Sequence, residues 1–494
     1  MAKIKLTAKV DSEILVVGFG LANKKLQIES GAAQLDSAAL LATLNAMGAT
    51  AKADEVIKLP GKTTKLVVFT GLGEIKSSYD PEVLRRAAGA AARHLNGNKS
   101  ATFSLPHKSV VELAAIAEGA ALGAYTFVEF LGSSKQEQKA PLELISLISK
   151  FSDTAQAKTA IKRAEIIAEQ TYLVRDLINT PPSHLTPDSF SQKMKKLASK
   201  YGVKAEIIND ATLKKSGYGG IIGVGQGSAN PPRLLHVSYS PAKAKKRYAF
   251  VGKGITFDTG GLALKPANGM EAMKSDMSGA AAVIAAVFAI AQLKLPIAID
   301  GWAPLAENMV SDNATRPSDV ITIYGGKTVE VLNPDAEGRL VLADALIKAA
   351  EVGKKAGGLD GIVDVATLTG AQVVALGTRT SAVMTNNEEF SNQFLKAAQL
   401  AGEAFWPMPL PVELRASLDS PVADIANIGD RMGGMLVAGL FLKEFIDPQT
   451  PWLHLDIAGP AYNDKHPHGY TTVGGTGISL RSLVQLAELA SSQA

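Results

Sequence analysis

The sequence predicts an α/β protein with two domains, each a mainly parallel sheet flanked by helices, and the C-terminal domain is the larger. Short apolar runs rich in β-branched residues alternate with alanine-rich segments of helical period along most of the chain, and this alternation is typical of such folds. The 494 residues exceed the length that one hydrophobic core usually organises. A polar stretch, Ser134 to Ala140, is followed by the long helical pattern that we take as the bridge between the two domains.

The N-terminal part contains the elements of an α/β domain. Predicted strands are Ile14–Val17 and Lys65–Phe69, and predicted helices are Pro81–His94 and Val111–Leu131, where apolar residues recur near a period of 3.6.

A long helical pattern, Ala155 to Ile178, bridges the two predicted domains. It ends at Asn179-Thr180-Pro181-Pro182, because two prolines cannot continue a helix. We therefore predict an N-terminal α/β domain over residues 1–165, which ends in a linker helix, and a C-terminal domain over residues 166–494.

The C-terminal part is also α/β. Its predicted elements are the strands Tyr248–Val251, Ile297–Trp302, Gly361–Ala366, Ala382–Met384 and Trp452–Ile457, and the helices Gly279–Leu293 and Leu340–Val352. Carboxylates, lysines or glycines follow several of these strands within a few residues. Open parallel sheets bind ligands beyond the carboxyl ends of their strands, so a site is expected there.

Composition narrows the class of protein. Hydrophobic residues make up 46% and charged residues 20%, as in ordinary globular proteins. A net charge of +4 gives no reason to expect nucleic acid or an anionic membrane as partner. Cysteine is absent, which excludes disulfides, thiolate zinc sites and a cysteine nucleophile. The N-terminus lacks the features of a secretory signal, and the apolar stretches are too short to cross a bilayer, so we predict a cytoplasmic protein.

The segment from Gly252 to Gly279 carries the first set of chemically active residues, Lys253, Asp258, Lys265 and Asp276. It is a glycine-rich connection directly after a strand, and a connection this long is uncommon unless it is functional. Taken alone, Asp276 could be the N-cap of the following apolar helix. Each lysine taken alone could lie on the surface.

The second segment is Asn333-Pro334-Asp335-Ala336-Glu337-Gly338-Arg339-Leu340. In an extended chain, residues i and i+2 point the same way, so Asp335 and Glu337 could present their carboxylates to one centre. Pro334 favours an extended setting for the residue before it. The alternative is an acidic turn that complements the dipole of the next helix.

Together the two segments supply four carboxylates and two lysines near strand ends. Oxygen-rich sites of this kind suit magnesium, manganese or zinc, and two ions can share bridging carboxylates. A lysine ligand must be neutral, which requires desolvation and nearby cations. Other catalytic motifs are missing: the seven histidines form no His-Glu-x-x-His pattern, and no Gly-x-Ser-x-Gly occurs.

Several long motifs in the same order resemble the leucyl aminopeptidase family of dinuclear metallopeptidases. They are KGITFDTGGLALKP, KSDMSGAA and NPDAEGRL, joined by RDLINTPPSHLTP, WAPLAENM and DVATLTGA. This resemblance spans most of the chain after residue 170, whereas the first 165 residues carry no motif of their own. It implies that the C-terminal domain is the catalytic metallopeptidase domain.

The resemblance also implies a role for each site residue. The expected metal ligands are Lys253, Asp258, Asp276, Asp335 and Glu337, which would hold two divalent ions per subunit, manganese or zinc, with magnesium as an alternative. The expected catalytic residues are Lys265, which polarises the scissile carbonyl, and Arg339, which anchors a bicarbonate acting as general base. The expected substrate-binding residues are Met273, Thr367, Leu368 and Gly370.

The family further implies an activity and a state of assembly. We expect release of leucine and other apolar residues from peptides with a free N-terminus, by a homohexamer that binds neither membrane nor nucleic acid. Two alternatives stay open: a DNA-binding role, which some bacterial relatives combine with peptidase activity, and a dinuclear phosphatase. One position departs from the family pattern, because Pro334 stands where threonine is usual, and this puts the loop geometry in question.

Overall fold

The computed structural model describes residues 1–492, which form two units. Unit 1 comprises Met1–Tyr172 and Lys465–Val473, and unit 2 comprises Leu173–Asp464 and the residues from Gly474 onward. The long helix α4 (Ala155–Asn179) contributes residues to both units, because the division falls between Tyr172 and Leu173.

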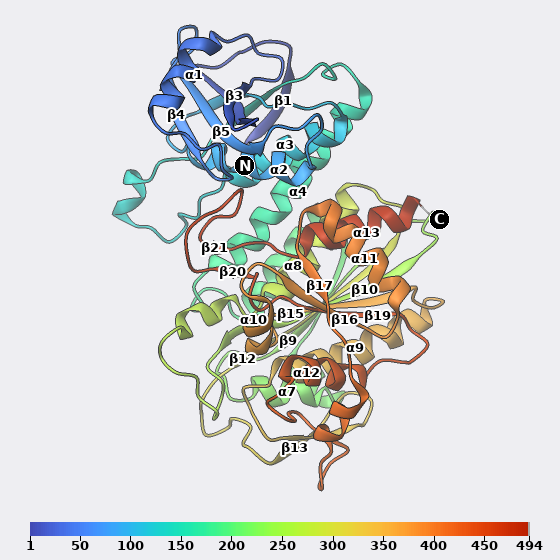
Figure 1. Cartoon of the computed structure of the whole chain (residues 1–494). Helices are drawn as coiled ribbons and strands as arrows, with labels where there is room; N and C mark the ends of the chain where they lie inside the picture. The colour runs from blue at the N-terminus through green and yellow to red at the C-terminus, as the bar shows by residue number, and fades with distance from the viewer. Residues whose placement is uncertain (493–494) are drawn as a thin grey trace. The chain divides into compact units, whose positions relative to one another are not determined.

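Unit 1 contains a seven-stranded sheet in the order β1-β7-β6-β2-β5-β4, with β3 paired to β2 (Figure 1). Its strands are β1 (Lys3–Thr7), β2 (Ile14–Ala22), β3 (Lys25–Glu29), β4 (Val56–Pro60), β5 (Leu66–Glu74), β6 (Ser100–Ser104) and β7 (Leu144–Ile148). Its helices are α1 (Ser37–Ala46), α2 (Pro81–Arg93) and α3 (Val110–Gly123), with a 3₁₀ turn, η1 (Ser133–Glu137). Five of the strands run parallel, as predicted.

The strands of unit 1 are apolar without interruption because helices cover both faces of the sheet. In β2, Val16 packs with α2 and α3, whereas Leu15 and Val17 belong to the core beneath α1. Parallel sheets buried on both faces produce such continuous hydrophobic runs. The N-termini of α2 and α3 are capped by Asp80 and Ser109.

One predicted helix is shorter than expected. The helical pattern from Val111 extends to Leu131, but α3 ends at Gly123. The hydroxyl of Tyr172 donates hydrogen bonds to the carbonyls of Ala121 and Ala124. These carbonyls lie in the last turn and would otherwise lack partners. A residue 48 positions away therefore completes the end of this helix.

Unit 2 contains a nine-stranded sheet in the order β17-β16-β19-β15-β10-β12-β9-β8, with β11 paired to β12. Its strands are β8 (Lys204–Ile208), β9 (Arg233–Tyr239), β10 (Arg247–Gly252), β11 (Gly254–Asp258), β12 (Ala298–Asn308), β15 (Gly361–Ala366), β16 (Ser381–Thr385), β17 (Phe405–Pro407) and β19 (Trp452–Asp456). Two small sheets comprise β13 (Asp319–Thr322), β14 (Thr328–Val331) and β18 (Ile425–Ala426), and β20 (Tyr462–Asn463) and β21 (Gly474–Gly475).

Helices cover both faces of this sheet. In Figure 1, α8 (Ser278–Gln292), α11 (Glu388–Ala401) and α13 (Leu480–Ser492) lie on one face, and α7 (Gly219–Gly225), α9 (Gly338–Lys355) and α12 (Gly434–Lys443) on the other. The remaining helices are α5 (Pro187–Lys200), α6 (Asp210–Lys215), α10 (Gly370–Leu376), η2 (Met270–Ser275) and η3 (Val412–Leu418). The predicted fold class is therefore confirmed.

The helix α8 is apolar on every side because it is a core helix. All but the last of its fifteen residues are buried. By length and composition the stretch Met270–Gln292 could cross a membrane, but 94% of its apolar window is buried inside the protein. A helix that is hydrophobic all round is expected in the core of a large domain.

Candidate metal centre

The carboxyl ends of the central parallel strands of unit 2 meet at one edge of the sheet. Lys253 follows β10, Asp258 ends β11, Asn308 ends β12 and Thr367 follows β15. The register places Gly252 opposite Val365, so the residues after both strands are neighbours. This is the edge at which the sequence predicts a site.

Three carboxylates lie together at this edge. One oxygen each from Asp258, Asp335 and Glu337 lies within 4.8 Å of the other two. Asp258 and Glu337 are buried, whereas Asp335 is half-buried. Like charges this close are unfavourable without compensating cations. Carboxylate oxygens are the ligands that hard divalent cations prefer.

Lys253 lies among the carboxylates with its ammonium buried. Its Nζ is 2.8 Å from Asp276 Oδ2 and 2.8 Å from Glu337 Oε1, and it donates to the carbonyl of Thr367. Burial lowers the pKa of Lys253, but the three neighbouring carboxylates outweigh burial and hold that pKa above its usual value. Conversely, burial raises the pKa of the Asp276 and Glu337 carboxyl groups.

Two of these oxygens fit a metal ion particularly well. Asp276 Oδ2 and Glu337 Oε1 are buried, and neither accepts a hydrogen bond of good geometry from a described residue. Buried polar atoms without such partners are rare in folded proteins. Their close cationic partner is the Lys253 ammonium, and this set of oxygen donors matches what a divalent cation requires.

The structure places Asp276 outside the N-cap of α8, which is the position considered for it from the sequence. Met277, not Asp276, occupies the N-cap of α8. The Asp276 carboxylate instead accepts a hydrogen bond from Thr367 Oγ1 at 2.6 Å. The helix-cap interpretation is therefore wrong.

Lys265, on the glycine-rich loop, pairs with the other two carboxylates of the cluster. It pairs with Asp258 Oδ2 at 2.8 Å and with Asp335 Oδ1. Burial lowers the pKa of Lys265, but the charges of Asp258 and other carboxylates raise it above its usual value. The loop depends on Gly260, because its φ is +86° and a Cβ there would lie 2.8 Å from Asp335 Oδ1.

The segment that carries Asp335 and Glu337 is a turn and not an extended strand. The amide of Ala336 donates to the carbonyl of Asn333, which closes the turn, and Glu337 has helical dihedrals of φ −82° and ψ −35°. The prediction that Asp335 and Glu337 lie on an extended strand end is therefore wrong. The turn and the start of α9 bring the two carboxylates together instead.

Pro334 is compatible with this turn. It occupies the second of the four turn residues, where proline is favoured and no amide donor is required. The side chain of Asn333 accepts from the amide of Asp335 at 2.9 Å, which tightens the turn further. The departure from the usual threonine therefore leaves a regular loop geometry.

We expect Pro334→Thr to change the free energy of unfolding by less than about 1 kcal/mol, in the destabilising direction. Proline restricts the unfolded chain, and a compatible proline contributes roughly 0.4–1 kcal/mol in this way. Urea denaturation of the two proteins measures the difference. A loss of several kcal/mol would show that the pyrrolidine ring makes packing contacts that matter more than its fixed φ.

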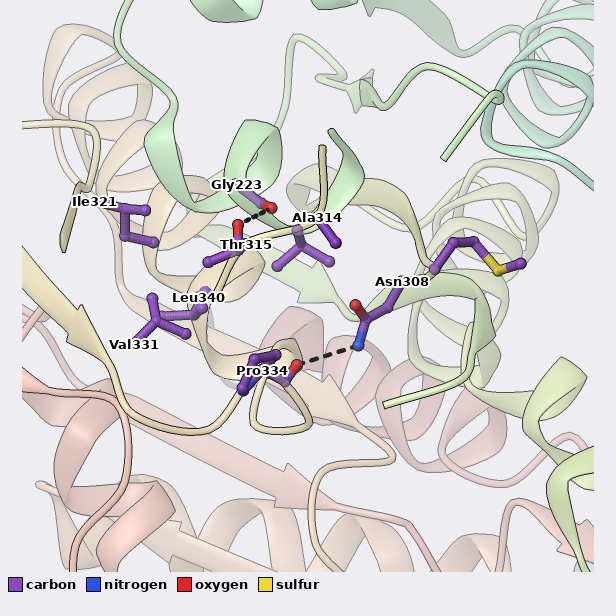
Figure 2. Close-up of a pocket in the computed structure, with 10 residues that line it drawn as sticks. Gly223, Asn308, Ala314, Thr315, Ile321, Val331, Pro334 and Leu340 are labelled. Atoms are coloured by element: carbon purple, nitrogen blue, oxygen red, sulfur yellow. Dashed lines mark hydrogen bonds between the residues drawn. The ribbon is translucent and has the colours of Figure 1, made fainter. Parts of the chain in front are cut away.

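A small cavity lies behind the turn (Figure 2). Pro334, Leu340 and Asn308 line it together with apolar residues of neighbouring segments. Its volume is about 10 Å³, which is room for about one water molecule. It is a packing void and not a site for a peptide.

Two asparagines that the sequence analysis did not single out hold the site together. Asn308 Nδ2 donates to Asp258 Oδ1 at 2.8 Å and to the carbonyl of Pro334 at 3.1 Å, so it joins the two acidic segments. Asn427 is fully buried, and its amide bonds to four backbone groups, namely Leu332 N, Asn333 N, Asn333 O and Ala336 O. In the sequence, Asn308 can be recognised as a candidate site residue only because it is a polar residue at the end of an apolar strand.

Replacing Asn427 with alanine is expected to lower the free energy of unfolding by about 3 kcal/mol. The change leaves several buried backbone groups without partners, each costing about 1–3 kcal/mol, partly offset by relaxation. Urea denaturation of the chelator-treated protein measures this loss. Asn392→Ala, on the exposed face of α11, is the control, and equal stabilities of the two variants would contradict the role of Asn427.

Arg339 is buried at the start of α9. Its Nη1 donates to the carbonyl of Asn427 at 2.8 Å, whereas its Nε is buried and has no hydrogen-bond partner among residues 1–492. Burial lowers the pKa of Arg339 to about 10, so the guanidinium stays protonated near neutral pH. It is thus a buried cation with one donor still unsatisfied.

The four predicted substrate-binding residues differ in their ties to the cluster. Thr367 contacts it directly, through Asp276 and Lys253. The amide of Leu368 already donates to Asp456 Oδ1. Gly370 begins α10, and Met273, in η2, is half-buried and linked to the cluster only because its carbonyl accepts from the amide of Asp276.

Known proteins match this chain over nearly its full length. Residues 172–484 match the model of the cytosol aminopeptidase family, catalytic domain, and residues 14–134 match that of its N-terminal domain. Two relatives named "Probable cytosol aminopeptidase" are 49% identical in Streptomyces coelicolor and 51% identical in Streptomyces avermitilis. Each comparison covers 97% of this chain and 96% of the relative.

Solved structures agree with this match. The bottromycin maturation enzyme BotP in complex with Mn is 36% identical, with a TM-score of 0.86, over 97% of this chain and all of that one. Fold and site thus define a metal-dependent aminopeptidase. The chain belongs to the cytosol aminopeptidase family, which confirms the resemblance drawn from its motifs.

Proposed function

We propose that this protein removes N-terminal amino acids from peptides at a dinuclear metal centre held by Lys253, Asp258, Asp276, Asp335 and Glu337. The observation that supports this most strongly is the convergence of four carboxylates from two segments of the chain on the buried Lys253 and the half-buried Lys265. When bound, a pair of divalent cations activates water and polarises a carbonyl. Manganese and zinc are the proposed ions, with magnesium as an alternative, and the Mn complex of BotP supports manganese.

Lys253 must lose its proton to act as a ligand. Its raised pKa shows that the carboxylates by themselves favour the ammonium form. Positive charge brought into the cluster reverses this balance, since metal binding to such groups releases protons. The carboxylates, whose pKa values burial raises, are held in their charged form by the same cations.

Lys265 is proposed to stabilise negative charge on the scissile carbonyl oxygen. Its ammonium is held by two carboxylates and is not fully enclosed, so a substrate atom can approach it. A fixed donor aimed at developing charge lowers the barrier because no solvent has to reorganise.

Arg339 is proposed to hold a small anion, bicarbonate, that acts as general base. The buried guanidinium has an unsatisfied Nε, and a planar guanidinium suits a planar carboxylate-like anion. The Asn427 carbonyl accepts from Nη1 of the same guanidinium and fixes its orientation.

The proposed substrates are peptides with a free α-amine and an apolar first residue, leucine included. Met273 in η2, with the backbone of Thr367, Leu368 and Gly370, would contact that residue. The exposed apolar side chains of Leu262 and Leu264 lie on the same loop as Lys265 and support an apolar preference. Family membership favours peptide amides over phosphate esters.

We further propose a cytoplasmic homohexamer, in which residues 1–165 form the N-terminal domain and residues 166–494 the catalytic domain. The family's name and the full-length match to its two domain models support the compartment and the division. Size-exclusion chromatography with light scattering tests the assembly.

Release of the chromophore from leucine, methionine, alanine and arginine anilides is the test of the proposed activity. Chelator-treated protein is expected to be inactive and to regain turnover with manganese or zinc. N-acetyl-leucine anilide is expected to react at least about a hundredfold more slowly, since a blocked amine loses a contact worth several kcal/mol. Equal rates for free and acetylated substrates would show that the amine is not recognised. No turnover with any metal would reject the proposed activity.

A further inference from the structure

A cavity of about 490 Å³ lies within unit 1 and shares no residue with the metal centre. Its walls come from the ends of three strands and the start of one helix: residues 29–32 after β3, 75–79 after β5, 106–108 before α3, and Lys150 after β7. Cavities of about 300–1,000 Å³ are typical of small-molecule sites.

The topology of the sheet opens a crevice at this place. β5 and β6 pair in parallel with opposite edges of β2. The chain adds strands on one side of β2 up to β5 and then crosses to the other side to form β6. β6 pairs with β2 only as far as Val17, and β3 takes the same edge from Gly18 onward. The loops after β5 and β6 therefore part at the carboxyl end of β2. Open α/β sheets bind ligands at such reversals.

The lining of the cavity is cationic and rich in donors. Lys76, Lys108 and Lys150 reach it from three different loops. Tyr79, of which only 6% is exposed, lines the cavity, and its buried hydroxyl makes no hydrogen bond of good geometry with residues 1–492. Burial raises the pKa of Tyr79, and the nearby backbone amide of Lys76 opposes this shift.

Two carboxylates also line the cavity and balance part of this charge. Glu112 accepts five hydrogen bonds, from Ser78 Oγ, Tyr79 N, Lys108 N, Ser109 N and Ser109 Oγ, and these bonds outweigh burial and lower its pKa. Burial raises the pKa of Glu29, with the charge of Lys108 opposing it. Three lysines therefore outnumber the two carboxylates of the lining.

We propose that this cavity is a second ligand site, which binds a small phosphate-bearing anion. The three ammonium groups and the Tyr79 hydroxyl would donate to the phosphate oxygens. The volume exceeds the needs of inorganic phosphate and can also admit an organic phosphate of the size of a nucleoside monophosphate. This inference is independent of the peptidase activity, because every residue that carries it lies between positions 29 and 150.

Isothermal titration calorimetry of the full-length protein with inorganic phosphate and with AMP tests the site. Both titrations are run before and after chelator treatment, because phosphate can also ligate metal ions. We expect saturable binding of one ligand per chain that survives chelation. Lys108→Gln and Lys150→Gln should each weaken it roughly tenfold, and Tyr79→Phe roughly threefold to tenfold, as expected for lost hydrogen bonds to a charged group. Lys25→Gln, on the exposed side of β3, is the matched control and should bind like the wild type.

Each outcome decides the matter. Tighter binding of AMP than of phosphate supports an organic phosphate as the ligand, and equal affinities support free phosphate. The proposal fails if neither ligand saturates the protein at about 10 mM, well above typical ligand affinities. It also fails if binding is lost on chelation, or if Lys108→Gln and Tyr79→Phe bind as tightly as Lys25→Gln.

Discussion

Glu337→Gln is expected to lower aminopeptidase turnover by about a thousandfold or more and to reduce the bound metal below two ions per chain. Glutamine keeps the size of the side chain but removes the charge of a buried carboxylate that approaches Lys253 and the Asp258–Asp335 pair. A neutral amide is a poor ligand for a hard divalent cation, and dinuclear catalysis needs both ions in place. Anilide hydrolysis and metal analysis by plasma mass spectrometry measure the two effects.

Glu388→Gln is the matched control for this variant. Glu388 also lies at the N-terminus of a helix, α11, but it is exposed to solvent. Removing its charge costs a few tenths of a kcal/mol of helix stability at most, and turnover should not change. Full activity and two bound ions in Glu337→Gln would reject the assignment of Glu337 as a ligand.

Lys265→Met is expected to lower kcat by roughly a hundredfold to a thousandfold while metal content stays at the wild-type value. Methionine has a similar length but supplies no charge, so the developing oxyanion loses a fixed donor, and losses of this size follow the removal of one such donor. KM should change by less than about threefold, because the contact is made mainly in the transition state. Steady-state kinetics with leucine anilide separate the two constants.

Two comparisons make the Lys265 result interpretable. Lys396→Met removes an exposed lysine of α11 and should leave both constants unchanged. If Lys265→Met instead lost metal and kept its specific activity per bound ion, the lysine would serve only to balance the charges of Asp258 and Asp335.

Much of the fold could be predicted because its strands are buried on both faces. Such strands, for example β2 and β10, are continuous apolar runs that are recognisable without knowledge of their neighbours. The predicted end of α3 was wrong because its last carbonyls bond to Tyr172, which belongs to a different helix. Local periodicity carries no information about such a partner.

The site shows the same division between local and distant causes. Lys253 and Asp258 could be identified because Lys253 directly follows β10 and Asp258 ends β11, within a glycine-rich segment. The geometry of Asp335 and Glu337 could not be predicted from the sequence, because it depends on Asn427. The side chain of Asn427 contacts Asn333, which is 94 residues away in the sequence. A turn held by so distant a residue cannot be distinguished from a strand end by spacing alone.

The sequence by itself determined which groups could take part in the chemistry: the charges, the glycines that allow close approach and the strands that deliver them to one edge. Only the tertiary structure decided which of these groups are buried and which of them pair with one another, as Asp276 and Glu337 do with Lys253. The physical reason is that desolvation and hydrogen-bond satisfaction depend on every neighbour in space. Those neighbours come from segments that the chain brings together only when it folds.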